Sequence, residues 1–192
     1  MASRFDDEIW ELVTEDPAPP PAHLARFVTD LDPVADALDI GCGDGRLTEL
    51  VTAERVTAAD VSAEALDRAR RRLPDARLVE LEPDAPVPLG DSAFDLVLCA
   101  ETLEHVRDVQ LLLSEARRLL RPGGTLALTT PAHGRATALL ALAGGWDRLF
   151  DPLSLHVRFF SRRSLARLLG ELGFDCRRLE RRHGTLLVIA TR

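Results

Sequence analysis

Short apolar runs alternate with stretches of helical periodicity through most of the chain. The runs are rich in Val, Leu, Ile and Ala, as in buried strands. We expect strands at Asp36–Ile40, Val56–Asp60, Arg77–Leu81, Phe94–Cys99 and Thr125–Thr129, and helices at Arg46–Ala53, Ala63–Leu73 and Val109–Leu120. Strands and helices in alternation predict a parallel sheet covered by helices on both faces.

The end of the chain follows a different pattern. Ser161 can cap a last helix that ends at Gly173. The stretches "FDCRRLE" and "TLLVIAT" follow and look like two strands joined around Arg182–Gly184. Two strands joined so closely must be antiparallel. We therefore expect an α/β fold: a doubly wound, seven-stranded sheet that is mostly parallel, with the last strand antiparallel.

The length of 192 residues, 46% of them hydrophobic, favours one domain. Residues 1–33 hold an amphipathic segment, the connector "EDPAPPPAH" and a helix at Leu24–Leu31, and we expect them to form part of a cap. Residues 34–192 form the main domain. Within it, residues 131–160 are too long for a plain connector and are expected to form a substrate lid with a helix at Arg135–Ala143. Its large apolar side chains suit a lid or a small hydrophobic core: Trp146, Leu149, Phe150, Phe159 and Phe160.

The net charge of −7 is unevenly distributed along the chain. Residues 1–110 carry 25 acidic and 10 basic side chains, whereas residues 111–192 carry 6 acidic and 14 basic ones. An acidic protein is a poor sequence-independent binder of nucleic acid, so we expect no nucleic-acid partner. The basic second half suits either an anionic small substrate or arginine-rich helix surfaces exposed to water.

No apolar run is long enough to span a membrane, and the acidic start "MASRFDDEIW" does not resemble a secretory signal. We therefore expect a cytoplasmic protein, as a monomer or a homodimer. The cysteines Cys42, Cys99 and Cys176 are odd in number and far apart. This spacing fits neither a disulfide framework nor a metal site, so we expect reduced and mostly buried thiols.

The stretch "ALDIGCGDGRLTEL" places a glycine-rich turn directly after the first expected strand. Such a turn lets the backbone approach a ligand closely. The dinucleotide-binding pattern G-x-G-x-x-G does not fit, because Arg46 stands where its third glycine is needed. A phosphate-binding P-loop requires a lysine, and the chain contains none.

Four further segments follow this turn in a fixed order. They are "TAADVSAEALDRAR", "DSAFDLVLCAETLEHVRD", "EARRLLRPGGTLALTTP" and "HVRFFSRRSLARLLGELGF". Together the five segments resemble the class I S-adenosylmethionine-dependent methyltransferases, in the small-molecule (type 11/12-like) branch similar to ubiquinone/menaquinone biosynthesis enzymes. The resemblance covers about residues 36–191. It implies a Rossmann-like fold, S-adenosyl-L-methionine as cofactor, S-adenosyl-L-homocysteine as product, and methyl transfer to a small-molecule acceptor on O, N or C.

The resemblance also implies roles for individual residues around the turn. Asp39 is expected to organise the turn near the cofactor's amino group, and Asp60 to accept hydrogen bonds from the ribose hydroxyls, as in dinucleotide sites. The turn itself, where a Cβ would collide with the cofactor, consists of Gly41, Cys42, Gly43 and Gly45. Other expected cofactor contacts are Val61 on the adenine and, after the fourth strand, Ala100, Glu101 and His105.

The adenine contact departs from the family pattern. The family has an acid after strand 3, but this chain reads "LEPDAPVPLG", and alignment without a gap puts Pro83 at that position. Asp84 takes the role with a shift of one residue, and Glu82 is the alternative.

Methyl transfer needs positioning above all, and a general base only for some acceptors. His133 follows strand 5 and His156 ends the insert, so both are candidates for a base that faces the acceptor, with plain packing as the alternative. We expect no metal site, because no cluster of acids with asparagine is present as in catechol methyltransferases. The contrasting hypothesis is a protein that binds S-adenosylmethionine without catalysis, alone or as the partner subunit of a biosynthetic complex.

Overall fold

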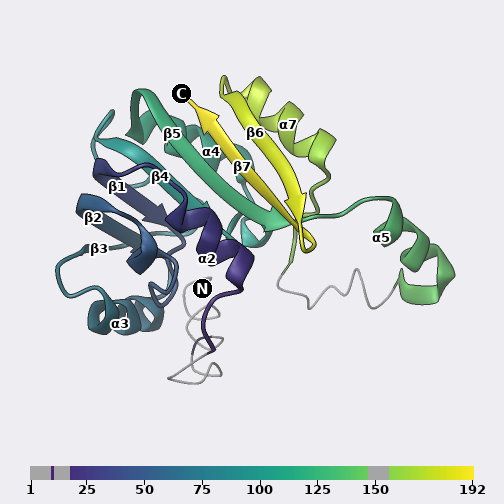
Figure 1. Cartoon of the computed structure of the whole chain (residues 1–192), viewed down its shortest axis with the longest axis horizontal. Helices are drawn as coiled ribbons and strands as arrows, with labels where there is room; N and C mark the ends of the chain where they lie inside the picture. Colours follow the sequence, from purple (N-terminus) through teal and green to yellow (C-terminus); the bar gives the residue numbers. More distant parts are fainter. Residues whose placement is uncertain (1–9, 11–17, 147–155) are drawn as a thin grey trace.

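The computed structural model describes Trp10 and residues 18–146 and 156–192 of the chain. In these residues, seven strands form one sheet in the order β3-β2-β1-β4-β5-β7-β6 (Figure 1). The strands are β1 (Val34–Ile40), β2 (Ala53–Asp60), β3 (Arg77–Glu80), β4 (Phe94–Ala100), β5 (Leu120–Pro131), β6 (Asp175–Arg182) and β7 (Thr185–Thr191). β7 is antiparallel to both of its neighbours, whereas the pairs among β1 to β5 are parallel. The expected doubly wound sheet and its antiparallel last strand are confirmed.

Helices cover both faces of this sheet, as expected (Figure 1). The α-helices are α2 (Ala22–Thr29), α3 (Ala63–Arg72), α4 (Val109–Leu119), α5 (Arg135–Leu140) and α7 (Arg162–Glu171). Short helical turns are η1 (Thr48–Leu50), η2 (Leu103–His105) and the π-turn η3 (Ala141–Gly145). Ser62 caps α3 and Ser161 caps α7, each accepting a hydrogen bond from the backbone three residues later.

Alternate residues along the central strands pack on opposite helical layers. Leu38 and Ile40 of β1 belong to the core that contains α4 and α7, whereas Ala37 packs with Leu24 and Phe27 of α2. Because successive strand residues point to opposite faces, one apolar run serves both layers. The sheet is thereby fixed on both sides, and its strand ends are held in place for a site.

The expected helix at Arg46–Ala53 is wrong. Only the single turn η1 forms there, and β2 starts at Ala53, which pairs with Val34 of β1. The glycine turn and this early start of β2 leave too few residues between the two strands for a full helix. The other expected helices agree with the structure to within a few residues, apart from Arg135–Ala143, where α5 ends at Leu140 and a π-turn follows.

The loop between β3 and β4 is fastened to α4 by a partly buried ion pair. Glu115 accepts a hydrogen bond from the backbone of Val87 (2.8 Å) and pairs with Arg118 (2.7 Å). Arg118 also donates to the carbonyl groups of Val87 and Leu89, at 2.9 Å each. The Arg118 guanidinium holds the pKa of Glu115 below its usual value.

Replacing Glu115 with alanine is expected to lower the free energy of unfolding by about 2 kcal/mol, because it leaves the buried amide of Val87 without its acceptor and removes one of the two carboxylates that pair with Arg118. Thermal denaturation followed by circular dichroism should show a melting temperature lower by about 4–8 °C. The control Glu171→Ala removes an exposed carboxylate at the end of α7 and should change stability by no more than about 0.5 kcal/mol. Equal melting temperatures for both variants would show that Glu115 does not fasten the loop between β3 and β4 to α4.

Candidate functional site

The carboxyl ends of β1, β2, β4 and β5 meet at one edge of the sheet, which is where open α/β sheets bind ligands. The glycine turn leaves β1 at this edge, and β4 runs directly into η2. Two groups of residues therefore lie at the edge. One surrounds the glycine turn, and the other surrounds the ends of β4 and β5.

Asp39, near the end of β1, is buried with only 3% of its surface exposed. The hydroxyl of Thr48 donates to its Oδ2 at 2.6 Å, so η1 orients the carboxylate. Within the described residues, Oδ1 has no hydrogen-bond partner. Burial raises the pKa of Asp39 to about 7. The hydrogen bond from Thr48 lowers this pKa and the nearby charge of Asp60 raises it, but both effects are smaller than that of burial. Within the described part of the chain no cation pairs with this carboxylate, and a bound ammonium group would supply one.

The glycine turn leaves no room for side chains at its first two glycines. Gly41 has φ +77°, and a Cβ there would lie 2.3 Å from the side chain of Thr102. Gly43 has φ +54°, and a Cβ there would lie 2.8 Å from the ring of Trp10. Cys42, which lies between them, is buried. Burial keeps the pKa of its thiol far above the usual value, so the thiol stays protonated and is a poor nucleophile.

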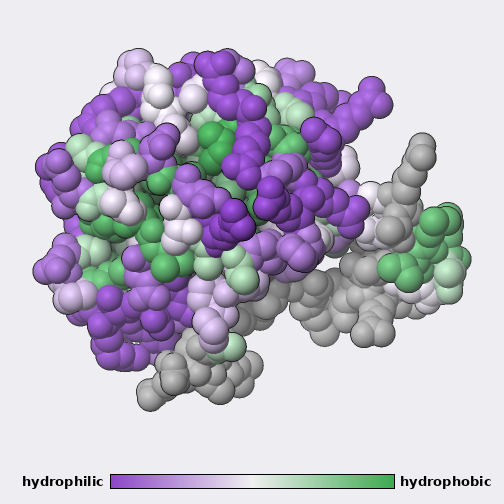
Figure 2. Space-filling view, viewed as in Figure 1, coloured by the Kyte–Doolittle hydropathy of each residue, from purple (hydrophilic) through white to green (hydrophobic). Residues whose placement is uncertain are grey.

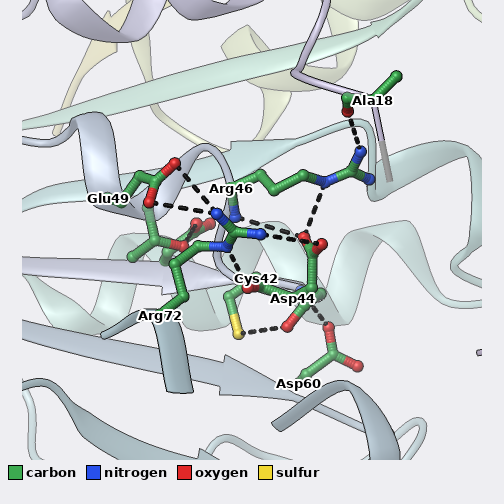
Figure 3. Close-up of polar contacts among 10 residues, drawn as sticks. Ala18, Cys42, Asp44, Arg46, Glu49, Asp60 and Arg72 are labelled. Atoms are coloured by element: carbon green, nitrogen blue, oxygen red, sulfur yellow. Dashed lines mark hydrogen bonds and ion pairs between the residues drawn. The ribbon is translucent and has the colours of Figure 1, made fainter. Parts of the chain in front are cut away.

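Asp60, at the end of β2, is tied to this turn by its carboxylate. Oδ2 accepts a hydrogen bond from the backbone of Gly43 at 2.8 Å, drawn as the dashed line from Asp60 to the turn in Figure 3. Oδ1 accepts a hydrogen bond from the backbone of Ser62 at 3.0 Å. A carboxylate can accept about four hydrogen bonds. The observed geometry is therefore compatible with ribose hydroxyls as further donors. Val61 next to it is partly buried against the core.

Two arginines brace the turn from outside (Figure 3). Arg46 pairs with Asp44 at 2.9 Å and donates to the carbonyl of Ala18 at 2.9 Å. Arg72 of α3 donates to the carbonyl of Asp44 at 3.1 Å. The residue that breaks the dinucleotide pattern, Arg46, thus joins the glycine turn to the segment that leads into α2.

Trp10 lies directly against the glycine turn, and sequence analysis did not assign it to the site. Its ring contacts Gly43, and Arg68 of α3 donates to its carbonyl at 2.7 Å while the guanidinium stands 5.8 Å from the ring centre. Its place in the amphipathic opening segment predicts burial, but nothing in the sequence indicates against what. Among the opening residues, Trp10 is described, and it lies against the glycine turn.

The two candidates for the adenine contact lie on the loop after β3. Asp84 is exposed, has φ +55°, and pairs with Arg107 at 2.6 Å. Glu82 is exposed on the same loop.

The second group of residues surrounds the ends of β4 and β5. Glu101 has φ +52° and accepts a hydrogen bond from Thr129 of β5 at 2.8 Å. Burial, and then repulsion from Glu104, raise the pKa of Glu101 to about 7. Ala100, which ends β4, is buried beneath them.

A returning segment, residues 156–160, brings the histidines together. The amides of Val157 and Arg158 donate to the carbonyl of Glu104 at 2.9 and 3.0 Å, and the amide of His133 donates to that of Phe160 at 2.7 Å. The segment is thereby held between the ends of β4 and β5.

The rings in this group are in direct contact. His105 and His156 have ring centres 4.9 Å apart, and His133 lies 4.9 Å from the ring of Phe159. Burial, and then the neighbouring histidine, lower the pKa of both His133 and His156, which favours neutral imidazoles. Nε2 of His133 is buried and, among described residues, has no hydrogen-bond partner. Two expected base candidates and one expected cofactor contact thus lie in one cluster.

The expected lid is described only in part. Phe160 is buried in the core and Phe159 is 37% exposed, while Leu149 and Phe150 lie outside the described residues. Figure 2 shows a hydrophobic surface at α5 and the following η3, where Leu139, Leu140, Leu142 and Trp146 are more than 60% exposed. His23 lies within hydrogen-bonding distance of the Thr185 hydroxyl (3.2 Å), and its ring is tilted against that of the exposed His183. Both histidines lie beside the end of β5, where Thr185 pairs with Pro131.

Known proteins resemble this chain over most of its length. A family model described as a methyltransferase domain matches residues 13–179. A ubiquinone biosynthesis O-methyltransferase of Thiobacillus denitrificans is 34% identical over 80% of this chain and 71% of its own, and a trans-aconitate 2-methyltransferase of Paracidovorax citrulli is 36% identical over 75% and 59%. The chain spans from 37% to 71% of the first three curated relatives that it matches.

The fold has solved counterparts as well. An S-adenosylmethionine-dependent methyltransferase of Mesorhizobium loti shares it with a TM-score of 0.69 and 22% identity, over 93% of this chain and all of the other. Among the described residues, no helix has the length and apolar character needed to cross a membrane. The matched family model, the curated relatives and the geometry of the glycine turn agree: the chain belongs to the class I S-adenosylmethionine-dependent methyltransferases.

Proposed function

We propose that this chain binds S-adenosylmethionine and transfers its methyl group to an oxygen of a small-molecule acceptor. One observation carries the proposal: the braced glycine turn with Asp39 and Asp60 lies at the same sheet edge as a cluster of neutral histidines and buried carboxylates. The first group offers carboxylate acceptors for an amino group and for ribose hydroxyls. The second offers groups that can accept a proton from a hydroxyl.

When bound, S-adenosylmethionine supplies a methyl group that its sulfonium already activates. The protein's share is to hold the acceptor in line with the sulfur–methyl bond and to exclude water, and such positioning contributes roughly 7–11 kcal/mol. As the acceptor oxygen bonds to the methyl carbon, its proton passes to a base, and the electrons of the broken carbon–sulfur bond remain on sulfur. The names of the two relatives, one of them an O-methyltransferase, favour an oxygen acceptor, and the basic second half of the chain suits an anionic one.

Incubation of the protein with S-adenosylmethionine and a panel of phenols, carboxylic acids and amines tests this proposal. We expect S-adenosylhomocysteine to form with at least one phenol or carboxylate, and with no amine. The variant Asp60→Ala serves as the inactive control. Tight binding of S-adenosylmethionine without turnover on any acceptor would instead favour the non-catalytic binding protein.

His133 and His156 are proposed to face the acceptor, with His133 as the base. The double variant His133→Ala/His156→Ala should lower kcat at least tenfold, because a positioned base contributes about 10²–10⁴-fold. Its affinity for S-adenosylmethionine should not change, since neither ring contacts the glycine turn. The control pair Asp67→Ala/Arg70→Ala removes two exposed side chains of α3 and should leave kcat unchanged. Unchanged turnover in the first double variant would remove the base from the mechanism.

A further inference from the structure

A buried carboxylate stands beside two imidazoles at the end of β4. Glu104 is 1% exposed, and its only ion pair in the described part of the chain is with His105, at 3.9 Å between Oε1 and Nε2. One ligand atom each from Glu104, His105 and His156 can be chosen so that all three lie within 4.8 Å of one another. Buried carboxylates are normally paired with a cation or bound to a metal.

The arrangement around Glu104 orients it toward the imidazoles. Thr130 of β5 donates to Oε2 at 2.9 Å, which leaves Oε1 on the side of His105. The backbone carbonyl of Glu104 accepts two hydrogen bonds from residues 157 and 158, so the position of His156 is fixed relative to the same residue. Such supporting hydrogen bonds are what hold metal ligands in place in proteins.

The chemistry of the three donors limits the choice of ion. Two imidazoles with one carboxylate suit first-row transition metals, whereas Mg²⁺ and Ca²⁺ prefer sites built from oxygen. Metal bonds of about 2.0–2.2 Å require donors roughly 3.0–3.5 Å apart. Donors that lie 4.8 Å apart must therefore approach by about 1.3–1.8 Å, which side-chain rotation can supply. Glu101 is close enough for its charge to repel that of Glu104, a repulsion that a cation would relieve.

We propose that Glu104, His105 and His156 form a binding site for a divalent first-row transition metal ion, such as Zn²⁺ or Co²⁺, at the acceptor side of the sheet edge. The sequence alone predicts no metal, because it contains no cluster of acids with asparagine and does not show that His156 lies beside the "LEHV" segment. The ion can bind whether or not the protein transfers methyl groups. A catalytic role for the ion, in contrast, rests on the proposed function: an acceptor oxygen bound to the ion would lose its proton more readily, with His133 as the proton acceptor.

Titration of the chelator-treated, full-length protein with Co²⁺ tests the site without cofactor or acceptor. Calorimetry should show one ion per chain, and the visible spectrum of bound Co²⁺ should appear in parallel. We expect the affinity to fall at least tenfold in each of three variants, Glu104→Gln, His105→Ala and His156→Ala. The control His183→Ala removes an exposed histidine of the turn between β6 and β7, which is not one of the three proposed ligands, and should bind as the unchanged protein does.

Three results would overturn the metal site. The first is no saturable binding of Co²⁺, and the second is binding that none of the three variants weakens. The third is Mg²⁺ binding more tightly than Co²⁺, which would exclude imidazole ligands. Because Glu104→Gln preserves shape and the hydrogen bond from Thr130, circular dichroism can verify that it remains folded. Failure here would leave the methyl-transfer test above unaffected, since that assay contains no added metal.

Discussion

Asp60→Asn should weaken the binding of S-adenosylmethionine at least 100-fold, which corresponds to about 2.7 kcal/mol. Each carboxylate oxygen of Asp60 accepts one backbone hydrogen bond, from Gly43 and from Ser62. An asparagine keeps only one of these acceptors and directs an NH₂ group at the other donor. The change therefore disturbs the glycine turn and also removes an acceptor for the ribose.

Isothermal titration calorimetry with S-adenosylmethionine measures this effect. The control Asp67→Asn neutralises an exposed aspartate on α3, where the side chain is 61% exposed, and should bind the cofactor as the unchanged protein does. A loss of less than threefold for Asp60→Asn would show that β2 does not end in the ribose site.

Asp39→Asn should stabilise the protein without ligand and at the same time weaken cofactor binding. Burial raises the pKa of Asp39 to about 7, above its value in an unfolded chain, so the folded state favours the protonated acid. Stability then falls as the pH rises from about 4 to 7, because the unfolded state releases this proton first. Asparagine removes that loss and keeps an acceptor for the Thr48 hydroxyl.

The gain for Asp39→Asn should reach about 2–4 kcal/mol at pH 8 and vanish near pH 4, since three pKa units correspond to about 4 kcal/mol. Urea unfolding at both pH values measures it. The control Asp36→Asn should do the opposite, because Arg55 and Arg121 lower the pKa of Asp36 and its charge stabilises the fold above pH 4. Equal stability of Asp39→Asn and the unchanged protein at pH 8 would show that the buried charge of Asp39 does not destabilise the protein without ligand.

The sequence predicts the elements that local pattern determines. The strands, the caps at Ser62 and Ser161 and the glycine turn all follow from residues close together in the chain. The helix at Arg46–Ala53 fails because the pairing of Val34 with Ala53 depends on two separate segments. Helical periodicity in a short stretch cannot compete with strand pairing of that kind.

The site shows the same division. Asp39, Gly41, Gly43 and Asp60 could be identified because they stand at strand ends within recognisable segments. The contact of Trp10 with Gly43 and the meeting of His105 with His156 could not, since each joins parts of the chain more than thirty residues apart. The hydrogen bonds from residues 157 and 158 to Glu104, and from His133 to Phe160, show where the returning segment lies at the sheet edge.

Binding of S-adenosylmethionine to the unchanged chain tests the central claim most directly. A glycine turn after the first strand and an acidic residue at the end of the second can bind either S-adenosylmethionine or NAD⁺. Calorimetry is therefore carried out with each of these two ligands separately. We expect one molecule of S-adenosylmethionine per chain, with a Kd on the order of micromolar, and no measurable binding of NAD⁺. Binding of NAD⁺ as tight as that of S-adenosylmethionine, or no binding of S-adenosylmethionine, would contradict the account.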